Sequence, residues 1–443
     1  MRTGSHVFSP SRMILLSVVF TIIVGTACLA LPSARTTFIP LIDLLFTATS
    51  AISVTGLLTV PLHSFTTSGH AIILILMQIG GLGLITLTLF TVSLFVDLGL
   101  ATQVMAGEML DLENWTGTRR ILIFIILFTL FCEFFGAVIL FQTLKNHYPL
   151  GKAIFYSIFQ SVSAFCNAGI NIVDNGIVQY ANDYLMLGTM ASLMFIGSIG
   201  FITIKELLLR FKPHAQKTKR LLSLQTRVVV TYMTGLVLIN TFIFWLLERD
   251  NTFSLMSLPE QILNAFFTSI SSRSGGFLTV YANDMQLASL FNIMINAFIG
   301  SAPGSTGSGI KITTAAILAA TINAAINGND TVNLKGRRIM QDQIYKALAV
   351  VTLSILWVLL ITFCLLITER SWNFLDIFFE VMSAFSTLGI TIGITPYLSV
   401  IGKLLIIFTM FIGRIGSLTL LIALRKRNEK QEFSYPQERI MIS

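Results

Sequence analysis

Four short segments that end in glycine recur along the chain, and this recurrence restricts the fold more than any other feature. The glycines are Gly56, Gly169, Gly276 and Gly389, which are 113, 107 and 113 residues apart. Ten residues before each stands a phenylalanine, and the glycine of an Ile-Gly pair follows 24, 28, 24 and 24 residues later. Such self-similarity marks a repeated structural unit, so we expect four similar units. The tetrads are Ser53, Val54, Thr55 and Gly56; Cys166, Asn167, Ala168 and Gly169; Arg273, Ser274, Gly275 and Gly276; and Ser386, Thr387, Leu388 and Gly389.

Apolar residues dominate the sequence around the tetrads. The chain of 443 residues is 54% hydrophobic and 11% charged, whereas a soluble domain carries about 25% charged residues. Several apolar runs approach or exceed the roughly 20 residues of a spanning helix. The first run is longer than the roughly 7–15-residue core of a signal peptide, so we interpret it as a span. The sequence predicts an all-α, multi-pass protein of the cell membrane with eight spanning helices, in the runs Met13–Leu31, Ala71–Phe95, Ile121–Phe141, Tyr184–Ile204, Val228–Leu247, Leu287–Ala325, Ala347–Ile367 and Leu404–Leu424.

A shorter apolar segment precedes each tetrad and is too short to cross the hydrocarbon core. A short helix followed by a glycine-containing bend is typical of a re-entrant segment. Non-helical backbone at membrane depth is tolerated only where protein buries it or where it lines water. We therefore expect the tetrads to face one shared aqueous axis. The short helices are predicted at about Pro40–Ile52, Gly151–Phe165, Pro259–Ser271 and Trp372–Phe385.

The net charge of +8 is concentrated in a few connecting segments. With eight spans, the basic segments fall on one side, which the positive-inside rule identifies as the cytoplasm, so both termini are expected there. Attraction to anionic lipid and docking to an acidic soluble partner explain these segments equally well. A nucleic-acid partner is not expected, because the loops are short. The basic clusters are Arg210, Lys212, Lys217, Lys219, Arg220 and Arg227; Lys335, Arg337, Arg338 and Lys346; and Arg425, Lys426, Arg427 and Lys430.

The repeats suggest boundaries for four units. We expect repeat 1 at 10–97, repeat 2 at 119–210, repeat 3 at 225–327 and repeat 4 at 343–425, followed by a cytoplasmic tail at 426–443.

The tetrads carry the chemistry that the sequence predicts. Selecting a dehydrated cation requires oxygens at fixed distances, and backbone carbonyls supply them without adding charge. Glycine permits the dihedral angles that successive inward-pointing carbonyls need, and each short helix directs its negative C-terminal end at the cation. Small-residue helix packing is the alternative interpretation of a single glycine. Four glycines at matched positions favour a filter that holds a dehydrated cation through backbone carbonyls.

Enzymatic chemistry has no basis in this sequence. It contains no phosphate-binding loop and no cluster of metal ligands, and its four cysteines lie within apolar segments without metal-site spacing. We therefore expect a protein that is not an enzyme and that has no cofactor of its own.

Two inner segments differ from the others. In repeat 3, four glycines and a proline within ten residues are incompatible with a continuous helix. In repeat 4, Arg414 follows Gly413 inside an apolar run. A buried arginine is costly and faces a cavity or a partner. It could repel cations as part of a gate, or pair structurally with a carboxylate or with loop carbonyls.

Other charged residues stand close to the tetrads. Asp43 and Asp376 lie thirteen residues before their glycines, near the start of a short helix. A carboxylate there is stabilised by the helix dipole, so capping is favoured over an ion-attracting ring. Arg273 and Glu380 are candidates for an ion pair between repeats.

Together these motifs resemble the superfamily of Ktr, Trk and HKT potassium transport proteins, and most closely the Ktr membrane subunit, over about residues 10 to 443. The resemblance implies that the tetrad glycines line a selectivity filter. In the plant branch a serine in the first position accompanies sodium preference, whereas this chain has Gly56 and glycine in all four tetrads. The resemblance therefore implies a filter that holds K⁺ as its metal ion, through backbone carbonyls. Besides the tetrads, the motifs are Gln78-Ile-Gly-Gly-Leu-Gly83, the glycine- and serine-rich break, and Phe411-Ile-Gly-Arg-Ile-Gly416.

The resemblance also implies a gate, partners and a transport mode. The break would be an intramembrane gate loop beneath the filter, although a static kink at Pro303 is the alternative. The chain would form a homodimer and dock on a cytoplasmic RCK-type ring that binds ATP or ADP, with Na⁺ either stimulating uptake or cotransported. An alternating-access symporter coupled to Na⁺ or H⁺ is the competing mechanism. Four repeats of one orientation favour a pore. The expected gate residues are Gly300, Ser301, Pro303, Gly304, Ser305, Thr306, Gly307, Ser308, Gly309, Lys311 and Arg414.

Overall fold

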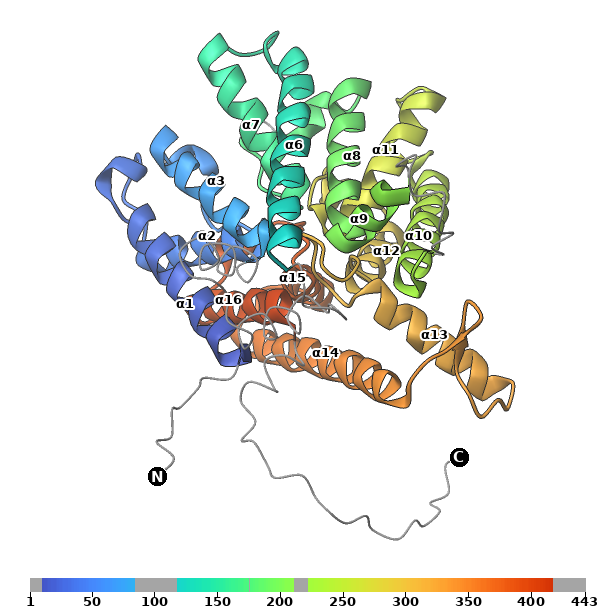
Figure 1. Ribbon diagram of the computed structural model, residues 1–443. Helices are drawn as coiled ribbons and strands as arrows, with labels where there is room; N and C mark the ends of the chain where they lie inside the picture. The colour runs from blue at the N-terminus through green and yellow to red at the C-terminus, as the bar shows by residue number, and fades with distance from the viewer. Residues whose placement is uncertain (1–9, 84–117, 175, 211–221, 417–443) are drawn as a thin grey trace.

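Four groups of helices follow one another along the chain (Figure 1). We describe the computed structural model over residues 10–83, 118–174, 176–210 and 222–416. The groups comprise α1 (Pro10–Leu29), α2 (Leu41–Ser53) and α3 (Thr67–Leu82); α6 (Thr118–Leu144), α7 (Leu150–Cys166), α8 (Tyr184–Ile199) and α9 (Phe201–Arg210); α10 (Leu224–Glu248), α11 (Leu258–Ile270), a π turn (Ser271–Gly275), α12 (Leu287–Phe298) and α13 (Ile312–Ile326); and α14 (Gln341–Thr368), α15 (Phe374–Ser386) and α16 (Val400–Ile415).

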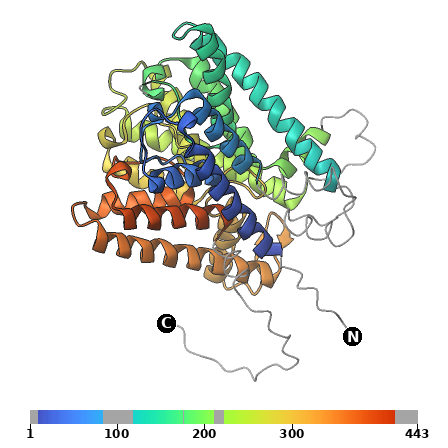
Figure 2. The ribbon, with the colours of Figure 1, turned by 90° about the vertical axis from the view of Figure 1, so that its left-hand side faces the viewer.

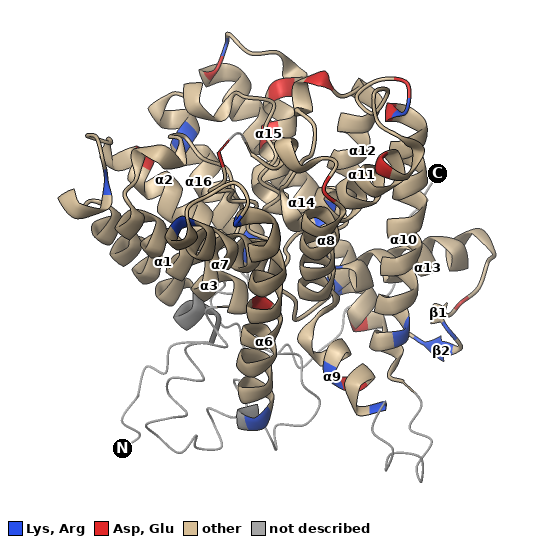
Figure 3. Cartoon of the chain, turned by 90° about the horizontal axis from the view of Figure 1, so that it is seen from above, with Lys and Arg blue, Asp and Glu red and all other residues tan. Residues whose placement is uncertain are grey.

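Strand structure within these ranges is limited to a short hairpin at the end of α13. It pairs β1 (Asn333–Leu334) with β2 (Arg337–Arg338). Figure 3 shows the ribbon mostly tan, with blue on β2 at the edge of the molecule.

Within the described residues, three helices are long and apolar enough to cross a membrane: α6, α10 and α14. The bent pair of α8 and α9 would provide a fourth crossing if it counts as one span. The prediction of one continuous helix over Tyr184–Ile204 is wrong, because the axis turns by 98° between α8 and α9 at Gly200. The predicted runs to Phe95 and Leu424 extend beyond the described residues.

The short helices begin and end at identifiable residues. Pro40 and Pro149 stand at the N-caps of α2 and α7, and both have extended ψ angles that keep the preceding chain out of the helix. A serine or asparagine and an acidic residue form a capping box on α11 and on α15. Asp376 therefore caps its helix as predicted. Each short helix lies within two residues of its predicted bounds.

The short helices lie inside the bundle, and the long helices lie outside. Thr47, Thr49 and Ser50 of α2 are fully buried although they are polar. In contrast, Phe134 of α6 and Leu356 of α14 are 65% and 57% exposed. An apolar outer surface and a hydroxyl-rich interior are expected for a protein in the hydrocarbon core, because lipid solvates the outer surface and buried polar groups need partners within the protein.

The last helix packs against the first group. α16 contacts α2 and α15 and lies beside α14, which follows the edge of the bundle in both views (Figures 1 and 2). The Lys403 ammonium is 2.6 Å from the Asp43 carboxylate, and both side chains are largely buried. Asp43 stands in the first turn of α2, where the helix dipole favours a carboxylate as predicted, and there it also pairs with a cation from the opposite end of the chain.

Candidate functional site

The four tetrads meet in a closed ring in chain order. A Cβ built on Gly56 would lie 2.5 Å from the carbonyl oxygen of Ala168 and 3.1 Å from the Cα of Gly169. The carbonyl before each tetrad glycine lies against the glycine of the preceding tetrad. A side chain at Gly56, Gly276 or Gly389 would clash with that carbonyl, and one at Gly169 would be tightly packed. A Cβ built on Gly169 would lie 3.2 Å from the carbonyl oxygen of Gly275. A Cβ on Gly276 would lie 2.3 Å from that of Leu388, and one on Gly389 would lie 2.1 Å from that of Thr55.

Backbone conformation also requires glycine at these positions. The φ angles of the four glycines are positive, at 95°, 66°, 73° and 89° in chain order. Two residues earlier, Val54, Asn167 and Thr387 are also left-handed, with φ of 58°, 59° and 48°. Side-chain-bearing residues pay a cost for this conformation, so the surroundings must hold the strands in place.

Serine hydroxyls at the ends of the short helices brace the strands. Ser50 accepts a hydrogen bond of 3.0 Å from the backbone N–H of Gly56, and Ser383 accepts one of 3.1 Å from that of Gly389. Ser163 donates a bond of 2.6 Å to the carbonyl of Ile170. Each of these serines stands six residues before its glycine and is fully buried, so it fixes the strand from behind.

The third strand departs from this pattern by one residue. Its bracing serine, Ser271, stands five residues before Gly276 and holds both backbone groups of Phe277, at 2.5 and 2.7 Å. A π turn replaces the left-handed residue found in the other strands. The phenylalanine expected at the buried position was Phe266, but Phe267 occupies it, with no exposed surface. Aligning the repeats on glycine alone therefore misplaces the third short helix.

Sequence reasoning missed a second set of glycines below the ring. α3, α8 and α16 end at Gly83, Gly200 and Gly416, which have φ of 81°, 93° and 91°. Each stands three residues after the glycine of the Ile-Gly pair, so the pattern Ile-Gly-x-x-Gly was the available signal. In the third group Pro303 takes this place. α3, α8 and α16 thus leave the helix at the same point in their sequence, whereas α12 ends earlier, at Phe298, so that Pro303 already lies within the loop that follows.

The glycine of the Ile-Gly pair has a packing role. A Cβ on Gly80 would lie 2.1 Å from the carbonyl oxygen of Ile52, near the end of the short helix in the same group. Gly197 and Gly413 show the same relationship to Phe165 and Phe385, at 2.1 and 2.0 Å. These glycines allow the inner helices to touch the ends of the short helices.

The segment from Gly300 to Lys311 is a folded loop between α12 and α13, so the predicted interruption of the helix is present. Its two arms pair through backbone bonds from Gly300 to Ile310 (3.0 Å) and from Ser301 to Ser308 (3.1 Å). It is also bonded to the break after α8, where the N–H of Phe201 donates to Gly304 O at 2.9 Å. An interruption this wide is more than a kink at Pro303.

Arg414 reaches this loop from α16. Its guanidinium donates bonds of 2.6 Å to the carbonyl of Thr306 and 3.1 Å to the hydroxyl of Ser308, and another to the carbonyl of Gly80. Its partners are therefore loop carbonyls and a hydroxyl rather than a carboxylate. Lys311 lies in the same region and donates to the carbonyl of Gly307 at 2.9 Å.

The loop also contacts two of the tetrads. Asn167 donates a bond of 2.9 Å to the Thr306 hydroxyl, which in turn donates to Phe165 O at 3.0 Å. Ser274 accepts a bond of 3.3 Å from the backbone of Ser308. The ring and the loop beneath it are thus directly hydrogen-bonded.

The predicted pairing of Arg273 with Glu380 is wrong. Arg273 donates to the carbonyl of Gly300 at 2.8 Å, so it anchors the start of the loop. Glu380 accepts hydrogen bonds from the hydroxyls of Thr391 and Thr395. Both side chains are buried, and neighbouring backbone and hydroxyl groups were better placed to satisfy them.

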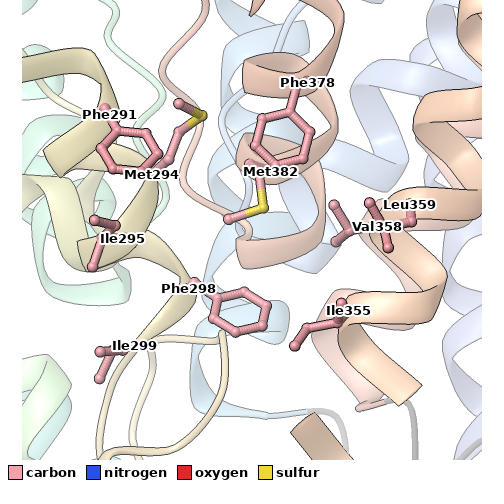
Figure 4. Close-up of a pocket in the computed structure, with 10 residues that line it drawn as sticks. All are labelled: Phe291, Met294, Ile295, Phe298, Ile299, Ile355, Val358, Leu359, Phe378 and Met382. Carbon is pink, nitrogen blue, oxygen red and sulfur yellow. The ribbon is translucent and has the colours of Figure 1, made fainter. Parts of the chain in front are cut away.

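A cavity of about 270 Å³ lies between α12, α14 and α15 (Figure 4). Phe298 and Met382 project into it, and its other lining side chains are also apolar. It offers no oxygen or nitrogen ligand from a side chain. In the described part of the chain, no group of histidine, cysteine and acidic residues could hold a metal ion, which leaves the backbone carbonyls of the ring as candidates.

Comparison with known proteins agrees with this architecture. The family described as "Cation transport protein" (TrkH) matches residues 12–435. The chain is 35% identical to the "Ktr system potassium uptake protein B" of Vibrio alginolyticus over 97% of this chain and 94% of that protein. It is 32% identical to the "Potassium/sodium uptake protein NtpJ" of Enterococcus hirae over 98% and 97% of the two chains.

Among solved structures, the potassium transporter TrkH of Vibrio parahaemolyticus has a similar fold. The TM-score is 0.74 at 20% sequence identity, over 96% of this chain and 87% of that one. Taken with the extent of the sequence matches, the fold and the apolar exterior, this chain belongs to the Trk/Ktr family of cation transport proteins and is a multi-pass membrane transporter, not an enzyme.

Proposed function

We propose that this protein takes up K⁺ through a pore whose selectivity filter is the ring of four tetrads. The observation that carries this proposal is the closure of the ring, in which the carbonyls of Thr55, Ala168, Gly275 and Leu388 each lie against a neighbouring glycine. A ring of backbone carbonyls can replace the water around a dehydrated cation. The potassium-uptake names of the sequence relatives support K⁺ as the ion.

The four groups of helices would be quasi-symmetric repeats around this pore, with the boundaries given above. Each group contains a short helix that ends at its tetrad, and α16 returns to α2. The C-terminal ends of four short helices would direct negative potential toward the ion.

The loop from Gly300 to Lys311 would be the gate, held by Arg414. In the arrangement described here, the loop is bonded to the second and fourth groups beneath the ring. Arg414 adds positive charge there, which opposes the passage of a cation, and Lys311 holds the loop through the carbonyl of Gly307. The structural and gating roles of Arg414 would therefore be two aspects of one contact, because releasing the loop also frees the guanidinium.

Regulation would come from outside the chain. We propose a homodimer that docks on a cytoplasmic RCK-type ring, with ATP or ADP bound to that partner only. The Ktr names of the relatives describe a multi-component system. The basic hairpin at Arg337 and Arg338 provides exposed positive charge for an acidic partner or for anionic lipid, and the positive-inside rule then puts both termini in the cytoplasm.

A second candidate function is alternating-access symport coupled to Na⁺ or H⁺. The breaks between α8 and α9 and between α12 and α13 favour it, because transporters use broken helices near the membrane midplane. Its relative NtpJ is named as a potassium and sodium uptake protein. Symport requires a fixed ratio of the two ions, whereas a pore passes K⁺ down its gradient without Na⁺.

Purified protein in liposomes tests both candidates. We expect K⁺ or Rb⁺ influx along an imposed K⁺ gradient without Na⁺, and the Gly276→Ser variant should lose K⁺ preference. In parallel, wild type should restore growth at low K⁺ to a bacterium without K⁺ uptake. Influx with an obligatory Na⁺ or H⁺ ratio would support symport, and growth that ignores Gly276→Ser would count against the filter assignment.

A further inference from the structure

Glu380 of α15 is a buried carboxylic residue that has no role in the proposed gate or among the carbonyls of the ring. It lies three residues before the bracing serine Ser383, and none of its surface is exposed. In the part of the chain that the structure describes, no basic side chain pairs with it. A carboxyl group inside a membrane protein is costly to retain without a task.

The carboxyl group instead holds the chain that follows the fourth tetrad. Thr391, two residues after Gly389, donates a hydrogen bond of 2.7 Å to one oxygen, and Thr395 donates to the other. The two hydroxyls are also 2.9 Å apart, and Thr391 accepts a bond of 3.0 Å from the N–H of Gly393. The strand is therefore tied to the short helix above the ring by Glu380, as it is tied at the ring by Ser383.

The other three strands have no equivalent tie. At the same place, three residues before the bracing serine, stand Thr47, Gln160 and Thr268. The hydroxyl of Thr47 bonds only to its own helix, at Asp43 O (2.8 Å), and the hydroxyl of Thr268 has no partner among the described residues. The side-chain N–H of Gln160 donates only to the sulfur of Met190, at 4.0 Å, and its side-chain oxygen has no hydrogen-bond partner among the described residues. The carboxyl tie is thus a feature of the fourth strand.

The position of the fourth strand affects both of its neighbours. A Cβ on Gly389 would lie 2.1 Å from Thr55 O, and the Leu388 carbonyl lies 2.3 Å from the equivalent point on Gly276. A strand packed this closely cannot shift without moving the carbonyls of the first and third strands. A carboxyl group has two oxygens and can hold both hydroxyls at once, one on each oxygen, which suits Glu380 to hold the spacing.

We propose that Glu380 is a positioning residue for ion selectivity, which sets the spacing of the ring by holding Thr391 and Thr395 behind the fourth strand. It does not touch the ion. This inference rests on the proposed function of the ring as a K⁺ filter. It predicts that selectivity, rather than gating, changes when the tie is removed.

Liposome flux of K⁺ and Na⁺ through purified variants tests the proposal. In Glu380→Leu, we expect the ratio of Na⁺ to K⁺ flux to rise on the order of tenfold, which corresponds to about 1.4 kcal/mol. Thr391→Val removes one hydroxyl at similar volume and should shift the ratio in the same direction. Glu380→Gln keeps an acceptor oxygen and should lie between wild type and Glu380→Leu. Thr47→Val, at the matched position of α2, should leave the ratio unchanged.

The flux ratio is independent of how much protein folds, so it separates positioning from general stability. The double variant Glu380→Leu with Thr391→Val should be no less selective than the less selective of the two single variants, because both substitutions remove the same hydrogen bond between Thr391 and Glu380. A ratio within twofold of wild type in Glu380→Leu and Thr391→Val, or additive effects in the double variant, would overturn the proposal. If Glu380→Leu does not fold, Thr391→Val and Glu380→Gln still decide it. Absence of K⁺ flux in wild type would refute the proposed function instead.

Discussion

The side-chain amide of Asn167, within the second tetrad, donates a 2.9 Å hydrogen bond to the hydroxyl of Thr306 in the loop beneath the ring. Thr306 also binds Phe165 O through its hydroxyl, Gly197 O through its N–H and Arg414 through its carbonyl. One loop residue therefore joins the ring, the second inner helix and the last helix. Any movement of the loop away from the pore axis must break these bonds together.

The Thr306→Val variant should weaken closure of the loop. Valine keeps the volume but removes both hydroxyl bonds. Two hydrogen bonds contribute about 1–3 kcal/mol together, so we expect basal K⁺ flux without a regulatory partner to rise about five- to 150-fold. Liposome flux measures this. Thr321→Val is the matched control, because the Thr321 hydroxyl bonds only within α13, to Ile317 O. Equal flux in both variants and wild type would contradict the role of Thr306.

Arg414→Ala should speed K⁺ uptake or weaken its control. The substitution removes three bonds to the loop and the inner helix together with one positive charge. Flux into vesicles, with and without the cytoplasmic partner, is the measurement. Unchanged flux in both conditions would refute a gating role and leave Arg414 as a structural anchor.

Gly389→Ala should disrupt the ring, because its Cβ would lie 2.1 Å from the carbonyl of Thr55 and its φ is +89°. We expect K⁺ flux to fall at least about tenfold, since both the clash and the left-handed backbone oppose the substitution. Gly235→Ala in α10 is the control. Nothing lies within 4 Å of its Cβ, and alanine favours helix there by up to about 1 kcal/mol. Similar flux in the two variants would argue that the ring does not conduct.

Asp43→Asn should destabilise the junction between the first and last groups. Breaking a buried ion pair from one side costs about 3–5 kcal/mol, because the other charge remains unpaired. We expect a lower melting temperature in detergent, with partial recovery when Lys403→Met is added. A melting temperature equal to that of wild type in Asp43→Asn would show that the pair carries no stability.

Sequence reasoning predicted the helical class, the short helices and the meeting of the tetrads, because glycine at matched spacing leaves few alternatives. It did not predict the break at Gly200, since an apolar run carries no mark of a bend unless Ile-Gly-x-x-Gly is read as one pattern. The predicted pairing of Arg273 with Glu380 was also wrong, and the pairing of Asp43 with Lys403 was not foreseen. The sign of a charge gives no distance to its partner. Glu380 accepts hydrogen bonds from nearby hydroxyls, Arg273 donates to a carbonyl, and Asp43 pairs with a lysine of α16. The third repeat has one residue fewer between its bracing serine and Gly276 than the other repeats have. Aligning the four repeats on their glycines concealed this difference.

The contact between the first and fourth tetrads has a consequence for biogenesis. The carbonyl of Thr55 and the site on Gly389 that it contacts are separated by more than three-quarters of the chain. Because synthesis proceeds from the N-terminus, the ring stays open until the fourth repeat has entered the membrane. A nascent chain that ends before Gly389 has no closed array of carbonyls, so the selective permeability that we propose would arise only when translation is nearly complete.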